Sequence, residues 1–204
     1  MDIDKIISAG GILAVAALVF AESGLLVGFF LPGDSLLFSA GIIAAQGKMD
    51  IVLLIVAICI AAIAGDNVGY SFGRRVGKRL HQKDGVILRK DHIAVAERFY
   101  EKHGKKTIIL ARFVPAVRTF APIVAGAGKM ERKTFMKYNI IGALLWGIGI
   151  TLLGYVAGDK IPNIEKYVTP VIIGAMLLSF GPALLHVLKD KRARDYLAHK
   201  ILRK

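Results

Sequence analysis

The chain has little of what soluble enzymes and metalloproteins usually carry. It has a single cysteine, Cys59, so no disulfide can form within it, and its 15 acidic residues are outnumbered by 28 lysines and arginines. The five histidines come with no cysteine or carboxylate cluster at ligand spacing, so the sequence predicts no bound metal and no cofactor. No nucleophile stands beside a general base, which argues against an enzyme.

Charged residues are also missing from long stretches of the chain. Tyr138–Gly158 and Tyr167–Leu188 contain no Asp, Glu, Lys or Arg, and Ile51–Gly73 contains only Asp66. About 20 mainly apolar residues span a bilayer, so these three stretches are predicted transmembrane helices. Ile6–Ala21 is at the lower limit of that length, and the sequence leaves open whether it crosses fully or lies partly in the interface.

The positive charges gather in particular connecting segments. Eleven Lys and Arg but four acids lie between Arg74 and Lys106, four cations lie in Lys129–Lys137, and seven lie in Lys189–Lys204. Cations concentrated on one side of membrane spans mark the cytoplasmic side. This distribution explains the net charge of +13 without a nucleic-acid partner, which a basic chain otherwise suggests.

Four charged residues stand in apolar segments that also contain prolines: Glu22, Asp34, Arg112 and Arg118. A charge at bilayer depth costs about 2.5–3.5 kcal/mol on insertion scales, so such charges are usually paired and functional. The two acids flank Pro32, and the two arginines flank Pro115. This pattern predicts a polar site inside a membrane protein.

The two charged segments begin a weak internal repeat. Pro32 is followed 37 residues later by the Gly-Tyr-x-x-Gly pattern of Gly69–Gly73, and Pro115 is followed 39 residues later by the same pattern in Gly154–Gly158. Each unit is therefore a proline-broken apolar segment followed by one transmembrane helix. The pair Gly69 and Gly73 is typical of a close helix–helix contact.

Loop charges orient these units in opposite directions. Basic segments precede and follow Thr107–Gly128, so this segment is expected to begin and end in the cytoplasm as a re-entrant hairpin. Pro115 and Pro122 are its predicted helix breakers, and Pro32 with Gly33 is predicted to break a second hairpin that enters from the opposite face. Irregular backbone at that depth needs protein or a water-filled cavity around it. Inverted-repeat transporters place a substrate site where such segments meet.

The predicted fold is an all-α polytopic membrane protein with one domain over residues 1–204, built on an inverted repeat of a re-entrant helical hairpin plus a transmembrane helix, with flanking helices. Its parts are repeat 1 (about 22–74), a cytoplasmic amphipathic segment (about 75–106), repeat 2 (about 107–158), and a C-terminal transmembrane helix with a basic tail (164–204). Within the cytoplasmic segment, Asp91–His103 is a predicted amphipathic helix.

Several motifs in this order resemble the DedA family, the bacterial branch of the VTT or SNARE-associated domain proteins. They are Glu22, the Phe-Leu-Pro-Gly-Asp of 30–34, the glycine-rich 65–74, the Arg-Phe-x-Pro-x-x-Arg of 112–118, and Ala125-Gly126. The resemblance covers about residues 15–160, and it departs from the usual pattern at Ala116-Val117, where the family more often has glycine after the proline.

This resemblance implies a multi-pass protein of the bacterial cytoplasmic membrane that transports lipids. Family members depend on two membrane acids and two arginines, which match Glu22, Asp34, Arg112 and Arg118. The family is associated with proton-motive force, with recycling of undecaprenyl phosphate and with phosphatidylethanolamine. The expected partners are thus a polyprenyl phosphate or phospholipid and protons, and a homo-oligomer is compatible with the sequence.

Alternatives stay open for the individual residues. Arginine suits bidentate recognition of phosphate, so Arg112 and Arg118 are predicted to hold a lipid head group, but both can instead simply neutralise the two acids. The acids are predicted to handle protons, because burial favours the protonated form and a nearby arginine the charged form. Asp66 either lines the same cavity or supports helix packing. Trp146 and Tyr155 are predicted packing or interface residues.

Two other functions compete with lipid transport. A proton-coupled antiporter for small cations or drugs fits two carboxylates but is disfavoured by two arginines. A phospholipid flippase or scramblase fits the same site with a different lipid.

Overall fold

Helices make up nearly all of the described structure, a computed structural model that describes residues 3–24, 33–80, 104, 106–161, 164, 166 and 170. In chain order the helices are α1 (Ile3–Gly24), α2 (Gly33–Ala45), α3 (Ile51–Leu80), α5 (Thr107–Ala111), α6 (Pro115–Ala127) and α7 (Arg132–Lys160). No strand occurs among these residues. The predicted all-α class is confirmed.

Two helices run the length of the molecule. α3 contains an apolar stretch of 26 residues, Ile51–Val76, and α7 contains one of 29 residues, Arg132–Lys160, and both are long and apolar enough to cross a membrane. They include two of the three predicted spans, while the third, Tyr167–Leu188, lies outside the described residues except for Pro170. α1 has 22 residues, about 33 Å at 1.5 Å per residue, and contains the borderline stretch Ile6–Ala21.

The ends of these helices follow from local chemistry. Asp50 caps α3, because its Oδ1 accepts a hydrogen bond from the Leu53 amide at 2.8 Å. α6 begins with Pro115 in the first turn, where its missing N–H leaves no bond unmade. α7 ends before Ile161, whose extended backbone is typical of a residue that precedes a proline.

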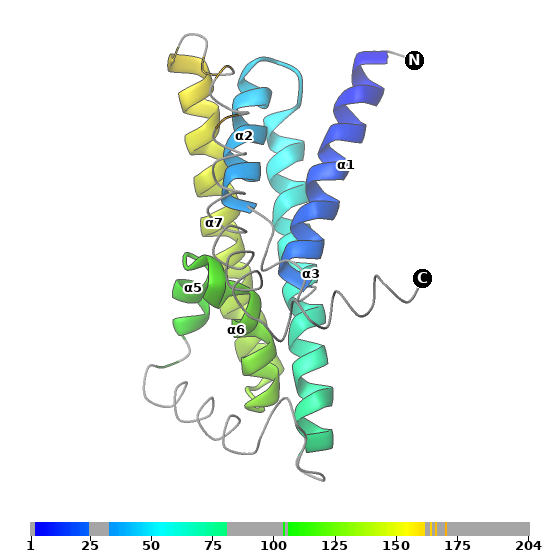
Figure 1. The fold of residues 1–204 in the computed structure, drawn as a ribbon, viewed down its shortest axis with the longest axis vertical. Coiled ribbons are helices and arrows are strands. Elements are labelled where there is room, and N and C mark those ends of the chain that lie inside the picture. The colour runs from blue at the N-terminus through cyan, green and yellow to red at the C-terminus, as the bar shows by residue number, and fades with distance from the viewer. Residues whose placement is uncertain are drawn as a thin grey trace, which may run out of the picture.

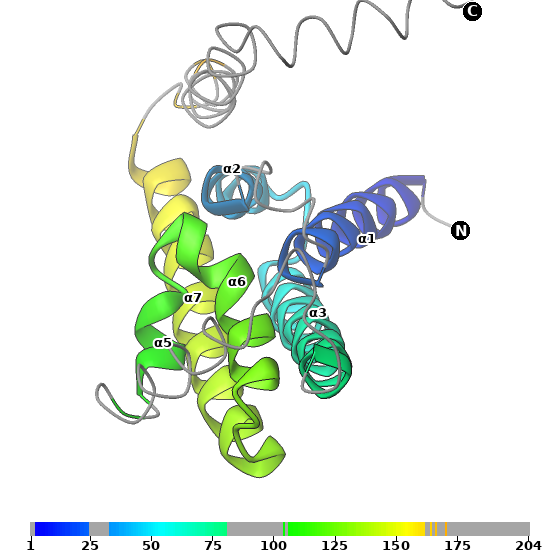
Figure 2. The same cartoon turned by 60° about the horizontal axis from the view of Figure 1, so that its bottom comes forward.

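The helices pack in two groups that α3 and α7 join. α1 and α6 pack on α3, whereas α2 and α5 pack on α7. Figure 2 shows α1 beside α3 on one side and α5 near α7 on the other. The largest apolar core, which includes Val19, Leu37 and Leu54, lies between α1, α2, α3 and α7.

Glycines let the backbones approach closely at the main helix contacts. A Cβ at Gly73 would collide with the Ile123 backbone of α6, and one at Gly126 would collide with the Tyr70 carbonyl of α3. The close contact predicted for the Gly69 and Gly73 pair is therefore confirmed at Gly73. A Cβ at Gly154 would likewise collide with the Phe38 backbone of α2.

Three helix ends meet near the middle of the long axis (Figure 1). α1 ends there, and α2 and α6 both begin there, α2 running toward one end of the molecule and α6 toward the other. α2 and α6 have 13 residues each, so each covers only about 20 Å. The N-termini of two half-length helices thus face the centre.

One predicted helix breaker does not break its helix. Pro122 is buried inside α6, which continues through it to Ala127. The proline only removes the amide that would bond to the Arg118 carbonyl. Its ring lies next to Gly69 of α3, where even an added Cβ would be in ordinary contact with Pro122 at 3.5 Å. The prediction was wrong at Pro122. The helix is instead interrupted between Ala111, the end of α5, and Pro115, the start of α6.

Other predictions fall outside the described residues: Pro32, the helix Asp91–His103 and the basic tail. Gly33 is described and is the first residue of α2.

Candidate functional site

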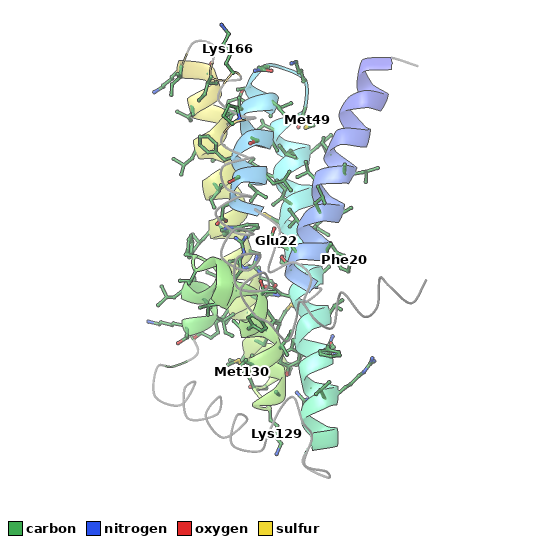
Figure 3. All side chains as sticks on the ribbon, viewed as in Figure 1. Phe20, Glu22, Met49, Lys129, Met130 and Lys166 are labelled. Carbon is green, nitrogen blue, oxygen red and sulfur yellow. The ribbon has the colours of Figure 1, made fainter. Side chains whose placement is uncertain are left out.

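Glu22 lies where the three helix ends meet (Figure 3), and the other charged residues belong to the helix ends and the link around it. Glu22 is in the last turn of α1, and Asp34 is in the first turn of α2. Arg118 is in the first turn of α6, and Arg112 lies in the short link between α5 and α6. The break in the helix explains how two arginines six residues apart reach one region of the molecule.

Arg118 binds two carboxylates from two different helices. Its Nη1 lies 2.6 Å from Asp34 Oδ1, and its Nη2 forms an ion pair with Glu22 Oε1. The three side chains differ in exposure: 3% for Glu22, 11% for Arg118 and 43% for Asp34. The pair with Glu22 is therefore closed to solvent, while the pair with Asp34 is on the open side.

Trp146 of α7 completes this cluster. Its indole N–H donates to Asp34 Oδ1 at 2.7 Å, so one carboxylate oxygen accepts from both Trp146 and Arg118. The Arg118 guanidinium also lies 5.1 Å from the centre of the indole ring. At that distance the ring attracts the cation. Trp146 thus positions both members of the open ion pair.

Arg112 has different ion-pair and hydrogen-bond partners, although its guanidinium also lies 5.8 Å from the centre of the Trp146 ring. Its Nη2 forms an ion pair with Asp66 of α3 and donates to Asn139 Oδ1 of α7 at 2.9 Å. Asn139 Nδ2 donates in turn to the Ile63 carbonyl at 3.3 Å. The side chains of Arg112 and Asp66 are only 6% and 9% exposed. This set ties the α5–α6 link to both long helices, as an interior ion pair with further hydrogen bonds can do.

Each half of the site contains one buried polar atom that has no hydrogen-bond partner among the described residues. These atoms are Glu22 Oε2 and Arg112 Nη1. Buried polar atoms normally have a partner in the protein or an ordered water. The Glu22 carboxylate also lies so close to Gly33 that a Cβ there would overlap it, which explains why the first residue of α2 is a glycine.

Among the described residues, no group of three His, Cys, Asp or Glu side chains is placed to hold a metal ion.

The sequence of this chain is similar to those of known membrane proteins. The family described as the VTT domain matches residues 31–156. Protein DedA of Escherichia coli strain K12 is 45% identical over 179 residues, which cover 86% of this chain and 81% of that protein. Inner membrane protein YqjA of the same strain is 36% identical over 162 residues, covering 79% and 73%.

This chain belongs to the DedA family. The uncharacterized membrane protein ML0287 of Mycobacterium leprae is a further relative, 39% identical over 186 residues that cover 91% of this chain and 83% of that protein. No solved structure matches this DedA-family chain. Its membership, together with the apolar stretches of α3 and α7, makes it a membrane protein.

In this DedA-family protein the four charges singled out in the sequence do not form one group of four. Arg118 contacts both Glu22 and Asp34, whereas Arg112 pairs with Asp66. Asp66 therefore forms an ion pair with Arg112. The sequence alone had left open whether Asp66 lines a cavity or supports helix packing. The roles of all these residues in binding or proton transfer stay predictions.

Sequence reasoning missed two residues of the site. Trp146 packs in the buried apolar core, as predicted, but its hydrogen bond to Asp34 was not foreseen. Asn139 is fully buried and bonded to Arg112. A signal did exist, because the two residues are seven apart on α7 and so share one helix face, and a polar amide within a span usually marks a partner inside the protein.

Proposed function

We propose that this protein moves a phosphate-bearing lipid across the membrane, with undecaprenyl phosphate as the leading substrate and the proton gradient as the energy source. The observation that carries this proposal is Arg118, held by Glu22 and Asp34 where the N-termini of α2 and α6 meet. In the proposed cycle the phosphate replaces the carboxylates on Arg118.

The backbone supports an anionic substrate. The N-terminus of a helix carries a partial positive charge and unpaired amides, and it therefore favours phosphate or carboxylate. Both half-length helices direct this end to the centre of the molecule. In the structure the Asp34 carboxylate lies at the first turn of α2. In the proposed cycle a lipid phosphate would take its place at this helix N-terminus.

The topology in this proposal is an inverted pair of re-entrant segments. α5 and α6 lie in one half of the long axis, and α2 lies in the other (Figure 1). Lys129 lies at the end where α6 finishes (Figure 3), close in sequence to Glu131, Arg132 and Lys133. The opposite end bears Lys48, Asp50, Asp159, Lys160 and Lys166. The more basic end is assigned to the cytoplasm. The relatives include a protein named for the inner membrane, and we place this chain in the bacterial cytoplasmic membrane as well.

Proton coupling follows from the exchange of partners. When phosphate takes Arg118, the Glu22 carboxylate is left 3% exposed without its cation, and an unpaired buried carboxylate is costly until a proton neutralises it. Release of the phosphate restores the ion pair and expels the proton. In this cycle a lipid phosphate on Arg118 and a proton on Glu22 would bind and leave together, without a catalytic step.

The test is reconstitution of the purified chain into liposomes. We expect undecaprenyl phosphate to cross faster than phosphatidylethanolamine, and a proton gradient to accelerate its movement. Equal movement of both lipids without any response to the gradient would instead indicate a scramblase. Liposomes with the Arg118→Gln variant are the control, because this variant keeps both carboxylates but loses the cation.

A cation antiporter is the second candidate, because the Asp34 side chain is 43% exposed and offers a carboxylate to a cation. Gradient-driven uptake of a cationic dye, together with no movement of undecaprenyl phosphate, would favour it.

A further inference from the structure

A second cationic region lies at the basic end of the molecule. Here a cavity of about 420 Å³ is lined by Tyr70, Ser71, Arg74, Arg75 and Arg132. Ligand cavities for small molecules typically begin at about 300 Å³, so the space is sufficient for a lipid head group. The residues come from the last third of α3 and from the first turn of α7.

The floor of this cavity is rigid. Tyr70 is 1% exposed, and its ring stacks on Phe135 with the centroids 4.5 Å apart. Its hydroxyl donates to the Met130 carbonyl at 2.5 Å and accepts from Arg74 Nη1 at 2.7 Å. Arg74 is therefore held in place before any ligand arrives, which reduces the entropic cost of binding.

Within the described part of the chain, the lining is cationic and contains no carboxylate. Among the described residues, no ion pair involves Arg74, Arg75 or Arg132. Glu131, the acid next to Arg132 in the chain, accepts a hydrogen bond from Thr134 Oγ1 at 3.0 Å and does not line the cavity. Arg132 is also the first residue of α7, where the helix dipole adds positive potential.

Three guanidinium groups around one cavity match a phosphate group, because each can donate two parallel hydrogen bonds to its oxygens. We propose that Arg74, Arg75 and Arg132 form a second phosphate-binding site at the end of α3 and the beginning of α7. Its ligand is a phosphate monoester or diester, either on a lipid head group or free in solution. This site does not depend on the function proposed for Arg118.

A local probe can test this site separately from the central one. Ser71 lines the cavity and is partly buried, so a Ser71→Cys variant places a thiol there, while the native Cys59 is buried in α3. The rate of labelling by an uncharged maleimide is measured in nanodiscs of phosphatidylcholine, with and without phosphatidic acid. A second series adds inorganic phosphate to phosphatidylcholine nanodiscs. The wild-type chain gives the background from Cys59.

We expect phosphatidic acid to slow the labelling. A double variant, Arg75→Gln with Arg132→Gln, is made in the Ser71→Cys background. It should raise the phosphatidic acid concentration needed to protect the thiol at least about tenfold, since each charge-assisted hydrogen bond contributes to affinity. Lys133→Gln with Lys137→Gln removes the same charge from exposed positions on α7 and should leave protection unchanged. Arg118→Gln should also leave it unchanged, even if that variant abolishes transport.

The two ligand series separate the sources of phosphate. Protection by phosphatidic acid alone indicates a lipid head group, and protection by inorganic phosphate as well indicates that the free ion binds. No protection by either ligand overturns the proposal, as does equal loss of protection in the arginine and lysine double variants. If the arginine double variant does not fold, the titration of the Ser71→Cys variant alone decides between protection and its absence.

Discussion

Arg112 and Arg118 carry the same charge in the same short region of sequence, yet their surroundings differ. Arg112 has one acidic partner, Asp66, an amide partner and a side chain 6% exposed. Arg118 has two acidic partners, and one of them, Asp34, is 43% exposed. Arg112 therefore joins α3, α7 and the α5–α6 link in the interior, whereas Arg118 has one buried acidic partner and one on the exposed side.

This difference predicts different roles for two arginines that have similar sequence surroundings. An interior ion pair is costly to break, since removal of one partner leaves a charge without compensation. An ion pair with an exposed partner is easily exchanged, because water and other ions compete for it. Substitutions at the two arginines and their partners test this division.

The largest effect is expected from Arg118→Gln. This variant removes the cation that binds both carboxylates. Removal of one partner from a buried ion pair costs several kcal/mol, so we expect transport of undecaprenyl phosphate in liposomes to fall by about 100-fold. The folded fraction, measured by size-exclusion chromatography in detergent, should stay high, because the carboxylates can take up protons. Wild-type transport in this variant would reduce Arg118 to a structural partner.

The next effect concerns Glu22→Gln and Asp34→Asn. Both variants are expected to fold, because the amides still accept hydrogen bonds from Arg118, and both should fail to support gradient-driven transport. Transport is measured with and without a pH gradient across the liposome. Wild-type, gradient-dependent activity in both variants would remove these acids from the proton pathway.

A different readout should respond to Asp66→Asn. Loss of the carboxylate leaves Arg112 charged and buried, and we expect the free energy of unfolding to fall by about 3 kcal/mol. Unfolding is followed by circular dichroism during titration with a denaturing detergent. Lys48→Gln, at an exposed position outside the helices, is the control. An unchanged stability would place Arg112 with Arg118 as an exchangeable cation.

The smallest effect is expected for Trp146→Phe. Phenylalanine keeps an aromatic ring near Arg118 but cannot donate to Asp34, and loss of one hydrogen bond of about 1 kcal/mol corresponds to about a fivefold change. The affinity for the lipid phosphate is measured in the same liposomes. A loss as large as that of Arg118→Gln would mean that Trp146 contacts the substrate directly.

Much of the fold could be predicted from the sequence because apolar length is a local property. The helices around Ile51–Gly73 and Tyr138–Gly158 follow from their uncharged runs, and the structure places α3 and α7 there. Pro122 shows the limit of such reasoning. A proline removes one hydrogen bond, but whether the helix ends depends on the space that neighbouring helices leave around it, and a single segment does not show that space.

The sequence by itself determined that this chain is a helical membrane protein, because a bilayer fixes the length of the apolar helices that cross it. It also showed charged residues within apolar segments, where each charge is costly. Only the tertiary structure decided which charges meet. Asp34 and Arg118 are 84 residues apart, and Arg112 and Asp66 are 46 apart. Their pairing depends on how the glycine contacts between α2 and α7 and between α3 and α6 align the helices. Ion pairs act over a few ångströms, so this alignment decides which arginine has only buried partners and which has a partner on the exposed side.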